Sequence, residues 1–338
     1  MSYRREAGSE NLLKAEGLSQ SAAQAIQARA YTDAHQYIKD ALILLKGRED
    51  SPSQVQISKL YCQLGAVHIE RGQWTEAEQS LKSSLQLSRI LKFFSLSAEA
   101  LVKLGQNAFK QGKFEAANNF LEEAVSLSAS IEDISAQAFG RLWLGAIAAL
   151  NGKYKPAEIE LLKAVSLANS ANDKSTEGRA RNILGENARL NGHHETAINH
   201  YQSALTIYKS IEDKFGMTMV IHNLGHVMTM MGNLDSALKH YNDSLIMAVE
   251  IDAIPAALEI LAALAQIAAK AGENDKALNL LGLVFANSAA PKEALHMFAE
   301  PALALLKQSL VVEKVESGLS HGASLNFEKV VDELLTEN

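Results

Sequence analysis

A Leu-Gly dipeptide recurs every 40 residues through the middle of this chain of 338 residues. A second glycine and an alanine keep the same phase, eight and thirteen residues after each leucine. Repetition at a fixed spacing is typical of stacked structural modules, each of which contacts only its neighbours. The sequence therefore predicts a repeat array. The dipeptides are Leu64-Gly65, Leu104-Gly105, Leu144-Gly145, Leu184-Gly185 and Leu224-Gly225.

Apolar residues within each module recur at helical spacing. Leu60, Leu64 and Val67 form one stripe, and a second stripe runs through residues 77–85. Gly72 and its counterparts lie between the two stripes, where a glycine accepts the left-handed geometry that ends a helix. Each module is therefore predicted to be a helix, a tight turn and a second helix.

Short polar turns join one module to the next. Asp133, Asp173 and Asp213 occupy the same phase in three of these turns. An aspartate at that position accepts hydrogen bonds from the free amides that begin a helix. We interpret these residues as helix caps and not as catalytic groups.

The glycine of each Leu-Gly pair falls in a helix interior, where it costs about 1 kcal/mol relative to alanine. A close approach between the two helices of a module would offset this loss. We expect the in-phase alanine of the second helix, such as Ala77, to pack against the backbone of this glycine. The glycines are thus predicted to be structural.

The pattern resembles the tetratricopeptide repeat. Twelve positions after Gly65 comes a small residue, Ala77, and four positions after Ala77 comes Leu81. Three periods later the residue that corresponds to Leu81 is Tyr201. The resemblance extends over about residues 20 to 287. It differs from the common pattern in its period of 40, where about 34 is usual, and in lacking a proline at the end of the second helix. Longer helices are expected to accommodate the additional residues.

These observations predict an all-α fold, a right-handed α-solenoid of about seven helix-turn-helix repeats followed by a C-terminal helical cap. Residues 1–53 are expected to form N-terminal helices and a degenerate first repeat. Residues 54–290 are expected to form six repeats of 40 residues. Residues 291–338 would form the cap.

The C-terminal segment departs from the period after Phe285. Pro291 is expected to begin a helix that Pro301 interrupts, with a further helix over 303–310 and a final one over about 326–335. The segment 280–286 and this tail resemble the end of bacterial STAND-type regulators. These are signal-transduction ATPases, including LuxR-type activators, in which a tetratricopeptide sensor follows a nucleotide-binding domain. The resemblance implies a sensor part or a stand-alone relative, and a plain cap that seals the array is the alternative.

Composition argues against several classes of function. The formal net charge is −7 and no lysine or arginine run is present, so the electrostatic footprint of a nucleic-acid binder is missing. The sequence has no run of 18 apolar residues and no signal-peptide core, which predicts no membrane interaction. The single Cys62 cannot form an intrachain disulfide. A cytoplasmic protein is expected.

The sequence contains no phosphate-binding loop of the Gly-x-x-x-x-Gly-Lys-Ser/Thr type. Cys62 shares its module with His68, but the two are expected on different faces of one helix, which argues against a nucleophilic pair. The prediction is a protein that is not an enzyme and has no cofactor.

One pair of histidines has metal-like spacing. His222 and His226 are four residues apart, which places both imidazoles on one face of a helix, as zinc sites require. Glu186 holds the equivalent position one module earlier and is the candidate third ligand. Two histidines do not make a site, and polar groove lining or hydrogen-bonded histidines are the alternative interpretation.

The family resemblance implies that the first helix of each module forms the inner wall of the array, with residues beside the Leu-Gly pair facing inward. These positions are apolar and aromatic near the third module and polar in the fourth and fifth. Aromatic anchors beside hydrogen-bonding groups suit an extended peptide or a helix. The alternative is that neighbouring helices bury Phe139 and Trp143. The predicted groove residues are Phe109, Phe139, Leu142, Trp143, Arg179, Asn182, Glu186, Arg189, His222, Asn223 and His226.

Three functions remain open from the sequence. The first is a non-enzymatic scaffold that binds a peptide or protein segment in its concave groove, as a signalling or regulatory sensor or adaptor. The second is a sensor of a small molecule or metal that uses His222 and His226. The third is a scaffold that assembles with copies of itself.

Overall fold

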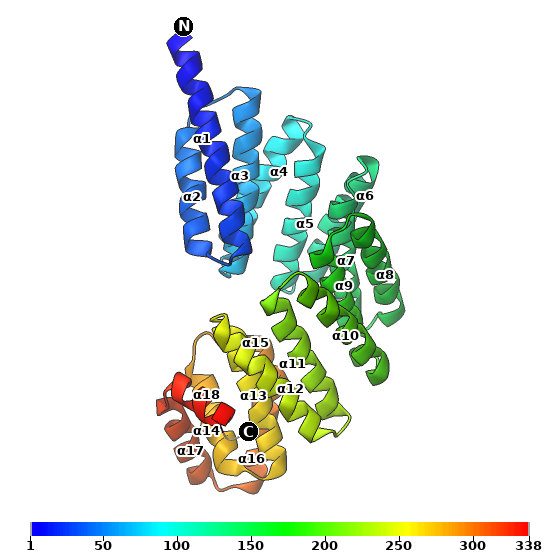
Figure 1. Ribbon diagram of the computed structural model, residues 1–338, viewed down its shortest axis with the longest axis vertical. Helices are drawn as coiled ribbons and strands as arrows, with labels where there is room; N and C mark the ends of the chain where they lie inside the picture. The colour runs from blue at the N-terminus through cyan, green and yellow to red at the C-terminus, as the bar shows by residue number, and fades with distance from the viewer. Residues whose placement is uncertain (1, 337–338) are drawn as a thin grey trace. The chain divides into compact units, whose positions relative to one another are not determined.

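The computed structural model describes residues 2–336, and in that range the regular structure is helical, without a strand. Seven successive helix pairs are followed by a C-terminal segment (Figure 1). The all-α repeat fold predicted from the sequence is confirmed. The pairs are α1 (Ser2–Gln27) with α2 (Tyr31–Leu44), α3 (Ser51–Glu70) with α4 (Trp74–Ile90), α5 (Phe94–Lys110) with α6 (Phe114–Ser130), α7 (Ile134–Leu150) with α8 (Tyr154–Ser170), α9 (Lys174–Leu190) with α10 (His194–Ser210), α11 (Lys214–Met230) with α12 (Leu234–Glu250), and α13 (Ile254–Ala271) with α14 (Asn274–Ala286).

The repeat period has a simple geometric origin. Each helix from α5 to α12 has 17 residues, and three turn residues separate it from the next helix. Two such helices and two such turns account for the 40 residues of one module. The additional length relative to the common repeat therefore lies in the helices, as the sequence predicts.

The two turns of a module reverse the chain in the same way but with different residues. From the second helix pair onward, the turn inside each module has a glycine at positive φ, between 69° and 80° from Gly72 to Gly272, which confirms the predicted helix ends. The turn between modules has a non-glycine residue at φ of 54° to 56°, which the sequence pattern does not reveal. These residues are Lys92, Glu132, Asn172, Glu212 and Asp252.

The three in-phase aspartates cap the helices that follow them, as predicted. Each carboxylate accepts a hydrogen bond from the backbone N–H three residues later, which satisfies an amide that has no partner within the helix. The donors are Ala136 for Asp133 at 3.0 Å, Thr176 for Asp173 at 2.9 Å, and Gly216 for Asp213 at 2.9 Å.

The Leu-Gly glycines mark a close approach of two helices, but the main partner differs from the one expected. A Cβ atom built on Gly105 would lie 2.5 Å from Cγ of Leu121 and 3.3 Å from the carbonyl oxygen of Ala117. In the module of Gly185 the ring of Tyr201 fills the corresponding space. The large residue four positions after the alanine therefore occupies the space that glycine leaves, and the alanine contributes its backbone.

The chain comprises two compact units, residues 1–176 and 177–338. Within the first unit the first helices contact one another in series, α1 with α3, α3 with α5 and α5 with α7. Among its described residues no comparable contact joins the second helices α4 and α6. The first helices thus form the inner face of this unit, and in the second unit α11 and α13 contact in the same manner.

Among the described helices, α13 alone is long and apolar enough to cross a membrane by length and composition. However, 67% of its apolar window is buried inside the second unit. It packs against α11, α12, α14 and the C-terminal segment. This is the environment of a core helix.

The C-terminal segment continues as a helix through Pro301, contrary to expectation. It consists of α15 (Lys292–Ala294), a π-helical turn η1 (Leu295–Ala299) and α16 (Glu300–Ser309). Proline lacks an N–H and its ring crowds the carbonyl four residues earlier, so a normal α-turn is unfavourable at this point. The turn widens, and the N–H of Glu300 donates to the carbonyl of Leu295, five residues back.

Two further helices complete the tail. The sequence does not predict α17 (Val312–Ser324), whereas α18 (Phe327–Thr336) matches the expected final helix. Helix α17 lies against α14 (Figure 1). Gly282 and Gly322 allow this crossing, because a Cβ on either would meet the backbone of the other helix.

Candidate functional site

The predicted groove residues fall in both compact units. In the first unit, Phe109 of α5 and Phe139 of α7 both contact the ring of Trp143. Their ring centroids are 5.0 Å and 6.2 Å from that of Trp143, in tilted and edge-to-face arrangements. Phe114 of α6 extends the group, 5.7 Å from Phe109. We call Phe109, Phe139 and Trp143 the aromatic cluster.

The members of the aromatic cluster differ in exposure. Phe109 and Phe139 are partly exposed, whereas only 9% of Trp143 is accessible to solvent. The indole N–H of Trp143 is buried and has no hydrogen-bond partner among the described residues. Leu142, predicted to line the groove, is buried in the core with 1% of its surface exposed.

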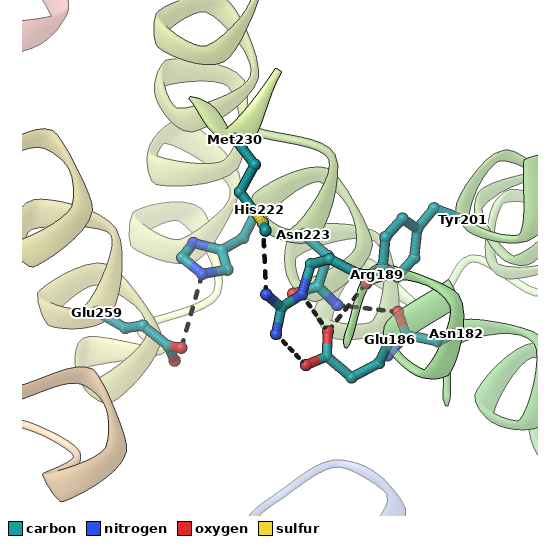
Figure 2. Close-up of polar contacts among 8 residues, drawn as sticks. All are labelled: Asn182, Glu186, Arg189, Tyr201, His222, Asn223, Met230 and Glu259. Atoms are coloured by element: carbon teal, nitrogen blue, oxygen red, sulfur yellow. Dashed lines mark hydrogen bonds and ion pairs between the residues drawn. The ribbon is translucent and has the colours of Figure 1, made fainter. Parts of the chain in front are cut away.

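In the second unit, an ion pair links two predicted groove residues of helix α9. The guanidinium of Arg189 donates two hydrogen bonds to the Glu186 carboxylate, one of them from Nε to Oε2 at 2.8 Å (Figure 2). The hydroxyl of Tyr201 donates to the same oxygen at 3.0 Å. Arg189 is only 7% exposed. A bidentate arrangement of this kind fixes both side chains in one geometry.

The ionisation of this pair follows from its surroundings. Burial raises the pKa of Glu186, but hydrogen bonds and charge from Arg189, together with the Tyr201 hydroxyl, outweigh burial and lower the pKa below its ordinary value. Burial lowers the pKa of Arg189, and Glu186 more than compensates, so the guanidinium stays charged. Burial and the negative charge of Glu186 raise the pKa of Tyr201, which keeps its proton.

Two asparagines connect α9 to α11. The side-chain amide of Asn223 donates to the side-chain oxygen of Asn182 at 3.0 Å (Figure 2). Met230, at the end of α11, places its sulfur 3.5 Å from Arg189. Both asparagines are partly exposed, and Arg179 is exposed. The second unit therefore combines internally paired polar groups with others that face solvent.

His222 and His226 lie on one face of α11, as their spacing predicts. Burial is the main cause that lowers the pKa of His222 to about 3 and that of His226 to about 4, and the positive charge of Arg189 acts in the same direction. Nε2 of His222 is 3.6 Å from the Glu259 carboxylate (Figure 2). Both imidazoles are therefore neutral near pH 7.

The rings around the two histidines are aromatic. Phe298 of η1 lies edge-on to both, with centroid distances of 5.7 Å to His222 and 4.9 Å to His226. Tyr241 of α12 is 5.4 Å from His222. The Nδ1 atom of His222 is buried and has no hydrogen-bond partner within the described range.

The proposed third metal ligand has a different role. Both oxygens of Glu186 accept hydrogen bonds from Arg189, whose positive charge would repel a cation. Residues 2–336 contain no group of three or more His, Cys, Asp or Glu side chains arranged to hold a metal ion. The described residues therefore offer His222 and His226 no third ligand for a metal ion.

Sequence reasoning missed three residues that shape this region. Phe298 lies beyond the repeats, so no phase relates it to His222 and His226. Tyr201 follows the repeat pattern, in which an aromatic residue packs against the Leu-Gly glycine, but its hydroxyl bond to Glu186 requires three-dimensional information. Glu259 holds an inner-wall position one module after Met219 and was not selected as a site residue.

Residues 56–130 match the family model of the tetratricopeptide repeat. No curated protein matches the chain. The family match covers α3 to α6, and the same 40-residue pattern continues through the helix pairs that follow.

Several solved structures share this fold at low sequence identity. A Rap protein complexed with competence and sporulation factor has a TM-score of 0.64 at 12% identity, with 96% of this chain and 99% of that chain covered. The apo form of RapI has a TM-score of 0.61 at 12% identity, covering 87% and 99%. A STAND protein with a tetratricopeptide repeat sensor, from Pyrococcus horikoshii, has a TM-score of 0.59 at 16% identity, covering 94% and 50%.

Proposed function

Because this chain is a tetratricopeptide repeat protein that resembles in fold the sensor region of a STAND protein, we propose that it is a non-enzymatic scaffold that binds a peptide or protein segment. Repeats of this family are typically non-catalytic interaction scaffolds. The scaffold acts in the cytoplasm of a bacterial cell as a signalling or regulatory adaptor. Its partner is a protein or a peptide, and the scaffold binds neither nucleic acid nor a membrane.

The aromatic cluster of the first unit is the observation that supports this proposal most. Phe109 and Phe139 are partly exposed on the first helices α5 and α7, which contact each other. Trp143 packs against both rings, tilted relative to Phe109 and edge-to-face with Phe139. Rigid aromatic side chains that expose part of their surface are the usual anchors of protein interfaces.

Polar residues of the second unit supply a different kind of contact. Arg179 is exposed and Asn182 and Asn223 are partly exposed on α9 and α11. Within the second unit, such groups can donate hydrogen bonds to, or accept them from, the backbone or side chains of a segment bound to that unit. The Rap protein of similar fold, which was crystallised with competence and sporulation factor, is consistent with this mode of action.

The test begins with a partner that co-purifies with the chain and is identified by mass spectrometry. Its Kd is then measured for the wild type and for Phe109→Ala and Phe139→Ala. We expect each substitution to weaken binding by about tenfold or more, since an aromatic hot spot contributes about 2 kcal/mol. Binding that is unchanged in both variants would refute the proposal.

A matched control separates loss of an anchor from loss of any apolar group. Ile159 is 44% exposed on α8, which belongs to the first unit and is the second helix of its repeat module. Ile159→Ala should leave the Kd unchanged. Trp143 is unsuitable as a probe, because removing a mostly buried indole would leave a cavity and destabilise the fold.

A further inference from the structure

The inner face of the second unit is covered by a segment of the same chain. Residues 292–309, which form α15, η1 and α16, pack on the first helix α13. From this segment Phe298 reaches the neighbouring first helix α11, where it contacts His222 and His226. These histidines flank the Leu-Gly pair, at positions that the family resemblance assigns to ligand contact. Phe298 is only 1% exposed.

The buried positions of this segment have the spacing of a helix that binds in a groove. Phe298, Ala299, Ala302 and Leu306 are buried, and Leu295 packs against the same core. Their spacing of i, i+3, i+4, i+7 and i+11 describes one face of a helix, as in amphipathic helices that bind to helical grooves. The opposite face is open to solvent, with Met297 at 44% exposure.

The segment is also bounded by irregular chain on both sides. Asn287 is extended at the end of α14, and Pro291 precedes α15. On the other side Leu310 is extended, and Val311 and Val312 are well exposed. Phe298 lies in a π-turn, a form that is frequent at functional sites. Helix 292–309 is therefore a distinct element joined to the array by short connections.

We propose that residues 292–309 are an internal ligand of the second unit, and that a partner helix with an aromatic anchor binds by displacing them. The ring of Phe298 marks the position that the partner's aromatic side chain would take, edge-on to His226 and His222. This inference rests on the proposed function and adds to it the class of partner and a means of regulation.

Competition within one chain has a quantitative consequence. A tethered segment is present at a high effective concentration, so it occupies the face most of the time. The apparent affinity for an external helix is then the intrinsic affinity reduced by the fraction of molecules whose face is open. Weakening the internal contact should therefore tighten external binding.

The experiment uses a synthetic peptide of residues 292–309, labelled with fluorescein and titrated with the full chain in a fluorescence anisotropy assay. We expect weak binding to the wild type and binding at least tenfold tighter to Phe298→Ala. A peptide that carries alanine in place of its phenylalanine should not bind the variant. Met297→Ala is the matched control, because its exposed side chain lies on the opposite face, and it should behave as the wild type.

Two results would overturn the inference. One is equal affinity of the peptide for the wild type and Phe298→Ala, with circular dichroism showing that both are folded. The other is equal binding of the peptides with and without phenylalanine. If Phe298→Ala does not fold, hydrogen exchange on the wild type decides instead. Excess unlabelled peptide should then accelerate exchange of backbone amides in 292–309, and unchanged exchange would contradict displacement.

Failure of this inference is distinguishable from failure of the proposed function. A partner whose Kd responds to Phe139→Ala but not to Phe298→Ala would preserve the scaffold function and remove the internal ligand. A peptide that binds Phe298→Ala tightly, with no partner sensitive to Phe139 or Phe109, would preserve the internal ligand and remove the aromatic-cluster site.

Discussion

Replacing Gly145 by alanine should show how strongly one residue controls the approach of two helices. A Cβ atom built on Gly145 would lie 2.5 Å from Cγ of Leu161 and 3.3 Å from the carbonyl oxygen of Ala157. The backbone at Ala157 cannot move without shifting α8. Gly145→Ala should therefore lower the free energy of unfolding by about 1 to 3 kcal/mol, although alanine has the higher helix propensity. Urea unfolding measures the difference.

Gly17 provides the matched control for this substitution. It lies in the interior of α1, and a Cβ built on it meets nothing within 4 Å. Gly17→Ala should raise the free energy of unfolding by up to about 1 kcal/mol, because only the propensity term remains. Equal effects of the two substitutions would show that the Leu-Gly glycines do not act through close packing.

The turns between modules contain a second residue-scale effect. Glu132 has a φ of 56° and is exposed, and a non-glycine residue in this region carries a steric cost. Glu132→Gly should raise the free energy of unfolding by about 1 kcal/mol. Glu132→Ala removes the same charge at the end of α6 but keeps the Cβ atom. Stabilisation by alanine equal to that by glycine would assign the effect to charge instead of backbone geometry.

Residue-scale features were predictable where a residue type has one dominant use. Aspartate before a helix and glycine after one each indicate a specific backbone need, and Asp133 and Gly72 meet it. Glu132 was not predictable as a left-handed residue, because glutamate has no preference for that geometry. Its position is imposed by the two helices that it joins.

At the scale of elements, α11 places two histidines at the core of the second unit, His222 buried and His226 half-buried. Their pKa values of about 3 and 4 in the folded state lie below the ordinary value of 6.5. The unfolded chain therefore binds more protons between pH 6.5 and 4, and stability falls as the pH is lowered through this interval. From pH 7 to pH 5 each histidine should cost about 2 kcal/mol of unfolding free energy.

Substitution of one histidine tests this pH dependence. In His226→Gln, the loss of stability between pH 7 and pH 5, measured by urea unfolding, should be about 2 kcal/mol smaller than in the wild type. The exposed His193→Gln controls for the substitution itself. The charged groups around the pair remain the same in all variants; they are Glu186, Arg189, Glu259 and Lys270. A pH dependence that is identical in His226→Gln and the wild type would contradict a neutral His226 in the folded protein.

Elements inside the array could be predicted from the sequence because each observation is repeated in every module. The C-terminal elements have no such repetition, and their prediction was correspondingly less accurate. The sequence predicts that Pro301 interrupts a helix, but the helix continues because a π-turn just before the proline accommodates a residue that has no N–H. Helix α17 was overlooked because its contact with α14 depends on Gly282 and Gly322, which are paired only in three dimensions.

For the whole molecule, the candidate site was predictable as a set of positions but not as a set of available side chains. The repeat phase identified residues beside the Leu-Gly pairs, and most of them lie together within their units. It could not show that the guanidinium of Arg189 is already paired with the Glu186 carboxylate, or that Phe298 covers His222 and His226. Phe298 lies outside the repeats, so no phase relates it to the histidines, and the phase of Glu186 and Arg189 places them on one helix without showing that their side chains pair.

Stability in a repeat array is a sum of local terms, because each module contacts only its neighbours. Leu121 is completely buried in α6 and fills the space beside Gly105. Leu121→Ala should cost about 2 to 5 kcal/mol locally, through lost burial and the cavity that remains. Hydrogen exchange followed by mass spectrometry should therefore show faster exchange in α5 to α8, while α11 to α14 in the other unit exchange as in the wild type. Ile159→Ala, on the exposed face of α8, should change neither region. A uniform loss of protection in both units would mean that the chain unfolds as one cooperative body, and the description as a modular array would then fail on energetic grounds.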